Sequence, residues 1–188
     1  MTITVVGIGL IGGSLMTDLR KRGFADSIIG VESNLQHRNI AQLCGLVDET
    51  DTLENAVDRS DLIIISTPVD TIWQMLPGIL DRIKGTSKVV TDMGSTKGKI
   101  ARVVKDHPGR GRYVALHPMA GTENNGCRAA FPELYHNAEV FVTVTAQSDP
   151  AAVDRVAAFW SELGTRVRRI EPDAHDRLVA HTSHISHI

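Results

Sequence analysis

The chain has 188 residues, of which 42% are hydrophobic and 22% charged, and its formal net charge is -2. This composition is typical of an ordinary globular protein with one full core, and the charge argues against nucleic acid or an anionic membrane surface as partners. Cys44 and Cys127 lack metal or redox spacing, and no signal peptide or membrane span is visible. We therefore expect small-molecule partners and a reduced, cytoplasmic compartment.

A strand and a glycine-rich turn open the chain. Residues 2–6 form a short run rich in β-branched side chains, which predicts a strand. Directly after it stands the motif Gly7-Ile8-Gly9-Leu10-Ile11-Gly12. An amphipathic stretch over 10–22 predicts a helix that stops at Gly23, and the next strand, over 27–32, ends on Glu32. Strand, glycine turn, helix, strand and acid in this order are the fingerprint of a dinucleotide-binding site.

Each glycine of the motif has a separate task. Gly7 turns the chain sharply, a side chain at Gly9 would hold the phosphates of a dinucleotide away, and Gly12 lets the helix pack closely on the strand. The N-terminus of that helix presents unpaired N–H groups and positive partial charge to the pyrophosphate. We therefore predict cofactor contacts from the whole motif, namely from Gly7, Ile8, Gly9, Leu10, Ile11 and Gly12.

Glu32 indicates which dinucleotide is bound. Its carboxylate is placed to accept hydrogen bonds from the adenosine ribose hydroxyls and would repel a 2′-phosphate, so we predict NAD rather than NADP. Arg38 lies a few residues later and would soften that repulsion if its side chain reached the ribose. The alternative for Arg38 is a solvated charge on the following helix.

Strand patterns continue along the chain at regular spacing. They are found at residues 61–66, 87–91, 112–116, 139–144 and 165–170. Helical patterns lie between most of them. This βαβ rhythm predicts an α/β fold, a Rossmann-type doubly wound sheet whose strands are mostly parallel.

The helices between these strands carry specific expectations. Ser33 is the expected N-cap of the second helix. A short piece around 46–47 and a helix over 52–57 should follow. The helical pattern over 69–83 contains Pro77, and we expect a break or kink there because proline removes a backbone hydrogen bond.

Three polar loops follow strands at the edge where an open α/β sheet places its chemistry. They are Ser66-Thr67-Pro68-Val69-Asp70, Asp92-Met93-Gly94-Ser95-Thr96-Lys97 and His117-Pro118-Met119-Ala120-Gly121-Thr122-Glu123. A loop in the first position usually passes beside the nicotinamide ribose, so we predict cofactor contacts from Ser66, Thr67 and Pro68. The alternative is that Thr67 and Pro68 are the N-cap and first-turn proline of the next helix, which does not exclude cofactor contacts.

His117 and Ser95 are the candidate catalytic pair. A histidine at a strand end, followed by a proline and a glycine-containing loop, can hold its imidazole in a cleft beside the nicotinamide. A nearby hydroxyl such as that of Ser95 can orient the imidazole or a substrate alcohol. The alternative for His117 is a buried structural role. Asp92 is placed to cap the following helix, and we expect Lys97 to be exposed.

Five motifs together resemble the prephenate dehydrogenase family, which includes arogenate dehydrogenases. They are GIGLIGGS (7–14), STPVD (66–70), DMGSTK (92–97), HPMAGTE (117–123) and SHISH (183–187). The resemblance implies NAD-dependent oxidative decarboxylation of prephenate to 4-hydroxyphenylpyruvate in tyrosine biosynthesis, driven by aromatisation of the substrate ring. The choice between prephenate and arogenate stays open.

The resemblance also implies roles for individual residues. His117 is the residue that accepts the proton of the ring hydroxyl, with Ser95 as its polar companion. Thr122 and Glu123 would lie at the substrate site near its entrance. His184 and His187 of the last motif would point toward the substrate pocket, with Ser186 standing where the family usually has proline.

A last helix is expected to begin near Pro172, with Asp173 in its first turn. We divide the chain into a dinucleotide-binding domain over 1–171 and the first helix of a truncated helical domain over 172–188. By resemblance, that second domain would form a homodimer and supply an arginine for a substrate carboxylate.

Two other functions remain as alternatives. Another nicotinamide-dependent dehydrogenase or imine reductase would share the glycine motif and the loop after the fourth strand, but would not explain HPMAGTE. A regulatory domain that senses NAD without catalysis would leave Ser95 and His117 without a task.

The final histidines offer a weaker alternative, a metal site. His181, His184 and His187 recur every three residues, so they could share one helical face. No acidic or thiolate ligand stands nearby in sequence. We therefore expect pocket lining or an interface there, and no metal.

Overall fold

The structure is a computed structural model that describes residues 1–120 and 127–185. The strands are β1 (Thr2–Val6), β2 (Ser27–Val31), β3 (Glu49–Thr50), β4 (Leu62–Ile65), β5 (Val89–Asp92), β6 (Tyr113–Pro118), β7 (Glu139–Thr143) and β8 (Arg166–Ile170). The helices are α1 (Leu10–Arg22), α2 (Leu35–Leu43), α3 (Leu53–Arg59), α4 (Val69–Ile83), α5 (Gly98–Val103), α6 (Pro150–Glu162) and α7 (Pro172–Ile185). Short 3₁₀ turns lie at Arg110–Arg112 and Cys127–Ala129.

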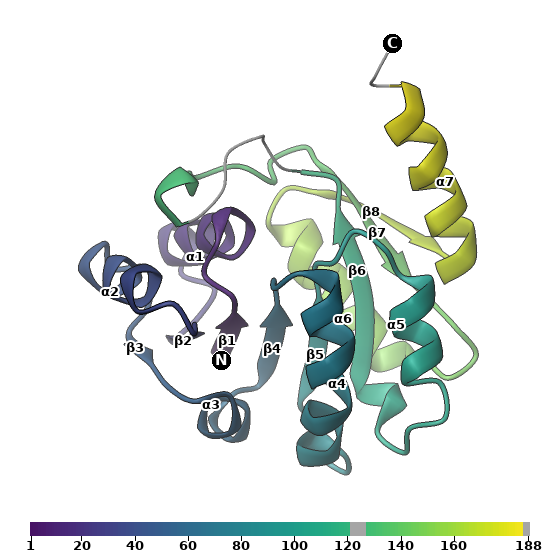
Figure 1. The fold of residues 1–188 in the computed structure, drawn as a ribbon, viewed down its shortest axis with the longest axis horizontal. Helices are drawn as coiled ribbons and strands as arrows, with labels where there is room; N and C mark the ends of the chain where they lie inside the picture. Colours follow the sequence, from purple (N-terminus) through teal and green to yellow (C-terminus); the bar gives the residue numbers. More distant parts are fainter. Residues whose placement is uncertain (121–126, 186–188) are drawn as a thin grey trace.

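The strands form one mostly parallel sheet in the order β3-β2-β1-β4-β5-β6-β7-β8. Neighbouring strands run parallel except β6 and β7, which are antiparallel. The chain winds outward from β1 to β3, returns to β4 beside β1, and then continues in the other direction (Figure 1). The predicted doubly wound α/β sheet is confirmed. Such sheets bind ligands at the carboxyl ends of the two strands where the winding reverses, here β1 and β4.

Alternation of side chains along the strands creates two cores, one on each face of the sheet. In β4, Leu62 and Ile64 join the core beneath α1 and α6, whereas Ile63 and Ile65 join the core beneath α3, α4 and α5. Because successive strand residues point to opposite faces, the apolar run of a central strand is buried on both sides. Helices accordingly lie on both faces of the sheet (Figure 1).

The expected break at Pro77 does not occur, since α4 is continuous over Val69–Ile83 with Pro77 inside it. The helix buries five residues against the sheet, at Ile72, Leu76, Ile79, Leu80 and Ile83. Burial of an apolar side chain stabilises by about 1.5–3 kcal/mol, so this face outweighs the roughly 3 kcal/mol that an internal proline costs. The predicted break was therefore wrong, because tertiary packing holds the helix together across Pro77.

Two smaller expectations also require correction. The N-cap of α2 is Asn34 rather than Ser33, because the Asn34 side chain accepts hydrogen bonds from the backbone of Gln36 at 2.9 Å and His37 at 3.1 Å. Strand β3 at Glu49–Thr50, which pairs with β2, was not predicted, and it lies just after the short piece expected around 46–47. The predicted end of α1 at Gly23 is confirmed by that residue's left-handed φ of +66°.

Helix α7 begins at Pro172, as predicted, and packs on β7 and α5. It rises past the sheet on the side of α5 and β8 (Figure 1). At its first turn Asp173 forms an ion pair with Arg102 of α5 at 3.1 Å. The helices of the described residues include none with the length and apolar character needed to cross a membrane.

Candidate functional site

The glycine turn has the geometry that its sequence predicts. Gly7 adopts a φ of +91°, a conformation that side chains disfavour. A Cβ atom on Gly12 would collide with the Gly7 carbonyl oxygen and the Ser66 hydroxyl, whereas a Cβ on Gly9 would meet nothing within 4 Å. Gly12 is therefore required by close packing within the protein. Gly9 instead keeps an open space in front of the N-terminus of α1.

Glu32 is held against this turn by backbone groups. Its carboxylate accepts hydrogen bonds from the N–H of Ile8 at 2.8 Å and from the N–H of Asn34 at 2.8 Å. His37 approaches the same carboxylate at 3.9 Å. These contacts fix a negative charge just beyond the end of β2, beside the glycine turn. They also occupy the N–H of Ile8, whose side chain is fully buried.

A cleft of about 230 Å³ lies between the glycine turn, the end of β2 and helices α3 and α4. Its lining includes Gly7, Glu32, Ser33 and Thr67. The Thr67 hydroxyl is buried without a hydrogen-bond partner in the described part of the chain, although buried polar groups are normally paired. Thr67 thus combines a buried, unpaired hydroxyl with a place in the lining of the cleft, next to a fixed carboxylate and an open glycine turn, and this set of groups fits a dinucleotide.

The other residues of the loop after β4 support the turn itself. The Ser66 hydroxyl donates to the carbonyl oxygens of Gly7 at 2.6 Å and Val6 at 3.1 Å. Pro68 is the N-cap residue of α4. Thr67 is therefore not the N-cap of α4. The alternative explanation of Thr67 and Pro68 placed the N-cap one residue too early.

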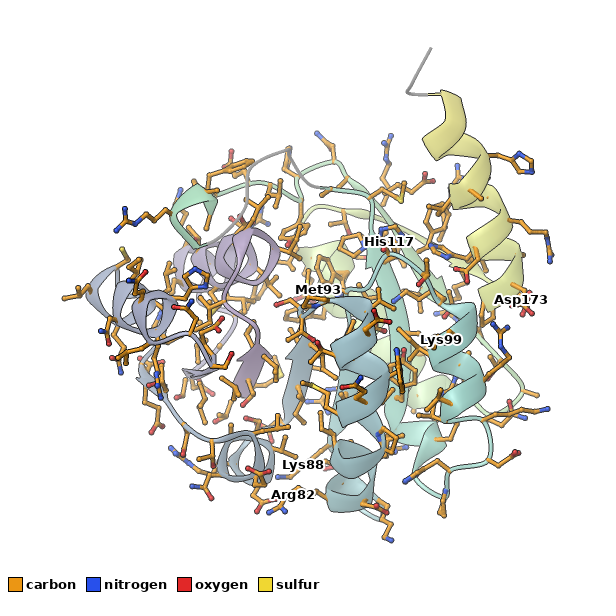
Figure 2. The ribbon with its side chains drawn as sticks, viewed as in Figure 1. Arg82, Lys88, Met93, Lys99, His117 and Asp173 are labelled. Carbon is orange, nitrogen blue, oxygen red and sulfur yellow. The ribbon has the colours of Figure 1, made fainter. Side chains whose placement is uncertain are left out.

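The second cluster lies on the α5 face of the sheet, around His117. Tyr113 and His117 are four residues apart on β6, so they point to the same face. Phe141 of β7 pairs with His117, and Asp92 ends the neighbouring strand β5. Figure 2 shows His117 near the upper edge of the sheet, between Met93 at the end of β5 and helix α7.

His175 of α7 contacts His117 directly. The Nδ1 atom of His117 lies 3.0 Å from Nε2 of His175, and the two rings meet edge to face with centroids 5.1 Å apart. His175 is fully buried and also contacts the Phe141 ring. No local pattern in the sequence indicates this burial, because it depends on α7 folding back onto β6 and β7.

Asp176 joins α7 to the start of α5. Its carboxylate accepts hydrogen bonds from the backbone N–H groups of Lys97 and Gly98, both at 2.8 Å, and lies 2.9 Å from Nδ1 of His175. Asp176 therefore caps α5, and the prediction that Asp92 caps it was wrong. The cap comes from 78 residues away, so no local pattern in the sequence indicates it.

Asp92 serves a different, fully buried network. It forms an ion pair with Lys97, accepts a hydrogen bond from the Tyr113 hydroxyl at 2.7 Å, and accepts another from the Gly94 N–H at 2.9 Å. Lys97 has no exposed surface, so the expectation of an exposed lysine was wrong. Burial lowers the pKa of Lys97, and Asp92 opposes that shift. Burial and the Asp92 carboxylate raise the pKa of Tyr113.

These surroundings keep the His117 imidazole neutral. Burial lowers the pKa of His117 to about 3, and the charge of Lys97 and the proximity of His175 act in the same direction, whereas Asp176 opposes them. A neutral imidazole is the form that can accept a proton. The arrangement can therefore present an unprotonated imidazole nitrogen to a substrate hydroxyl at neutral pH.

The remaining predicted site residues are less constrained. Ser95 lies exposed in the loop between β5 and α5, close in sequence to the buried network. Thr122, Glu123 and His187 lie outside the described residues, and so does the side chain of His184. Among the described residues, no three His, Cys, Asp or Glu side chains gather as a metal site would need.

Comparison with known protein families gives a match over residues 15–169, to the family described as prephenate dehydrogenase, nucleotide-binding domain. The cyclohexadienyl dehydrogenase of Zymomonas mobilis is 30% identical over 188 residues, which are 99% of this chain and 64% of that relative. The chain thus spans just under two thirds of the relative's length.

Solved structures give the same picture. Prephenate dehydrogenase from Aquifex aeolicus, in complex with hydroxyphenyl propionate and NAD+, superposes with a TM-score of 0.83 at 30% identity. The match covers 95% of this chain and 62% of that one. Synechocystis arogenate dehydrogenase superposes with a TM-score of 0.87 at 32% identity, over 98% of this chain and 64% of that one.

Proposed function

The chain belongs to the prephenate dehydrogenase family, and we propose that it binds NAD and removes the proton of the substrate hydroxyl in the oxidative decarboxylation of prephenate to 4-hydroxyphenylpyruvate, in tyrosine biosynthesis. One observation carries the proposal. A neutral histidine, His117, stands at the same edge of the sheet as an open glycine turn. A dinucleotide bound at that turn and a substrate near His117 would share this edge.

The cofactor side of the proposal rests on the glycine turn and its cleft. The N–H groups at the start of α1 would bind the pyrophosphate, in the space that Gly9 leaves open. Glu32 would accept the ribose hydroxyls and Thr67 would pair its free hydroxyl with the bound cofactor. When bound, NAD would be the oxidant, since it accepts a hydride from ring carbon C4. The fixed charge of Glu32 favours NAD over NADP.

The chemical side of the proposal rests on His117. Its imidazole accepts the proton of the C4 hydroxyl, so that the oxygen–hydrogen bond breaks as a nitrogen–hydrogen bond forms. The ring carboxylate leaves as carbon dioxide, the electron pair of the broken carbon–carbon bond makes the ring aromatic, and the imidazolium returns its proton to the product oxygen. Ser95, exposed in the loop after β5, would hold the same hydroxyl in line with the imidazole. Thr122, Glu123, His184 and His187 remain proposed substrate contacts on the strength of their motifs.

Arogenate is the second candidate substrate, because a structure at 32% identity is that of an arogenate dehydrogenase. The two substrates differ only in a keto or amino group on the side chain. The deciding experiment follows NADH absorbance in the active enzyme that contains this chain, with each substrate in turn. Turnover of prephenate supports the proposal, turnover of arogenate alone selects the second candidate, and NAD reduction by neither substrate contradicts both.

The quaternary and cellular parts of the proposal rest on the family alone. We propose that the enzyme acts as a homodimer in the cytoplasm, with a helical domain that begins at α7. Sedimentation of the active enzyme as a monomer at micromolar concentration would contradict the dimer.

A further inference from the structure

The hydrogen bonds around His117 determine which of its ring nitrogens carries the hydrogen. The chain of contacts begins at Asp176, whose carboxylate accepts from two backbone N–H groups at 2.8 Å each. Partial burial opposes ionisation of Asp176, but the hydrogen bonds from Gly98, His175 and Lys97 outweigh it and lower its pKa. An ionised carboxylate can only accept hydrogen bonds.

The next step fixes His175. Its Nδ1 atom lies 2.9 Å from the Asp176 carboxylate, so Nδ1 must carry the hydrogen. In its neutral form a histidine carries a single ring hydrogen, and Nε2 of His175 is then an acceptor. The ring cannot turn to exchange these roles, because it is fully buried against Phe141 and His117.

The last step fixes His117. Its Nδ1 atom lies 3.0 Å from the accepting Nε2 of His175, so Nδ1 of His117 must donate. Neutral His117 therefore has its hydrogen on Nδ1 and an unshared electron pair on Nε2. When Nε2 takes the hydroxyl proton of the substrate, the positive charge on the ring is stabilised through Nδ1–H, His175 and Asp176.

We propose that His175 and Asp176 are positioning residues that hold His117 in the tautomer with a bare Nε2, so that the catalytic base of the cofactor-binding domain is aimed by the first turns of α7. The catalytic part of this statement rests on the proposed function, whereas the tautomer does not. Neither residue touches the substrate in this proposal. Both act through His117.

The test reads the tautomer by ring ¹⁵N NMR of this chain labelled at histidine, at pH 8. We expect His117 to show a protonated Nδ1 and an unprotonated Nε2. A hydrogen on Nε2 of His117 overturns the proposal. A protonated His175 would produce the same result, because its Nε2 would then donate to Nδ1 of His117. Neither result bears on whether the enzyme oxidises prephenate.

Two substitutions separate positioning from packing. His175→Gln keeps an amide oxygen near the place of Nε2, so it should preserve the His117 tautomer. His175→Leu removes the acceptor, so the Nε2–H form of His117 should appear. If the leucine variant keeps the wild-type tautomer, His175 does not position His117. Should the leucine variant fail to fold, the wild-type and glutamine spectra still decide the assignment.

Kinetics of the active enzyme connect the tautomer to turnover. His175→Leu should lower kcat by about 10²-fold or more with little change in KM, as expected when a base is held in the wrong tautomer. His175→Gln should recover most of that loss. Equal losses in both variants would show that packing alone, rather than the hydrogen bond, explains the effect. The turnover of His117→Asn tests the proposed function separately. If this variant keeps its turnover, the proposed function is overturned, but the assignment of the His117 tautomer is not.

Discussion

The carboxylate of Glu32 is the single charged group that we expect to select NAD over NADP. This carboxylate is fixed by the N–H groups of Ile8 and Asn34, so it cannot swing away from a 2′-phosphate. We predict that NAD binds at least ~10-fold more tightly than NADP, a difference of about 1.4 kcal/mol. Glu32→Gln should bring the two affinities together in calorimetric titrations. Asp106→Asn, an equal charge change at an exposed position, should not, and equal affinities in the wild type would defeat the prediction.

The buried ion pair of Lys97 and Asp92 leads to a second prediction at this scale. Lys97→Met leaves the Asp92 carboxylate buried without its counter-ion and should cost about 3–5 kcal/mol of unfolding free energy. The double variant Lys97→Met/Asp92→Asn removes both charges and should recover most of that loss. Urea denaturation measures both values. Additive losses in the double variant would mean that the two side chains do not interact.

Residues with local signals were the predictable ones. The φ of Gly7 follows from the glycine motif, and the position of Glu32 beside the turn follows from the order of strand, turn, helix and strand that contains this motif. Lys97 and His175 could not be placed, because their burial depends on α5 and α7 closing over the same strands. A lysine and a histidine in sequence carry no sign of the partner that a distant helix will provide.

At the scale of elements, the glycine turn offers a matched pair of substitutions. Gly9→Val places atoms in open space, so it should block the pyrophosphate and weaken NAD at least ~10-fold. Its unfolding free energy should change by less than about 1 kcal/mol, or roughly 2–4 °C in Tm. Gly12→Ala forces a collision with Gly7 and Ser66 and should destabilise the fold itself. Thermal melts and NAD titrations test the pair, and reversed effects would refute the assignment.

Strand patterns predicted the sheet well because alternation and apolar runs reflect burial directly. Helix details were less predictable. α4 runs through Pro77 because its apolar face is anchored on the sheet, and α5 is capped by Asp176 from α7 rather than by Asp92. Both predictions were wrong because they considered only residues nearby in sequence, whereas tertiary contacts determine whether α4 continues and which residue caps α5.

For the whole molecule, the lowered pKa of His117 makes stability depend on pH. The pKa of His117 is about 3 in the folded chain against an ordinary value of 6.5, so between these values the unfolded chain binds a proton that the folded chain does not bind. The contribution of His117 to the unfolding free energy is therefore complete above pH 6.5. It is lost as the pH falls toward 3, by at most about 1.4 kcal/mol per pH unit. Urea denaturation at pH 7, 6 and 5 should show this slope. The slope should be smaller in His117→Asn, and an identical slope would contradict the assignment.

The fold class and the family were both predictable for the molecule as a whole, and both are confirmed. The order of strands follows from βαβ rhythm and the family from five motifs spread along the chain. The contact between His117 and α7 was not predictable, because it joins a strand end to a helix 58 residues later. Only the folded chain shows that His117 and His175 of α7 lie in contact.

The most direct test of the account is the pH dependence of kcat/KM for NAD-dependent oxidation of prephenate, in the active enzyme and in its His117→Asn variant. We predict a loss of roughly 10²-fold or more in turnover with NAD affinity nearly unchanged, because a general base is removed outside the cofactor contacts. Because the pKa of His117 is about 3, the acidic limb that reports its protonation should lie well below the ordinary histidine value of 6.5, and it should vanish in the variant. A variant that keeps this limb, or that turns over prephenate at the wild-type rate, would show that His117 is not the base.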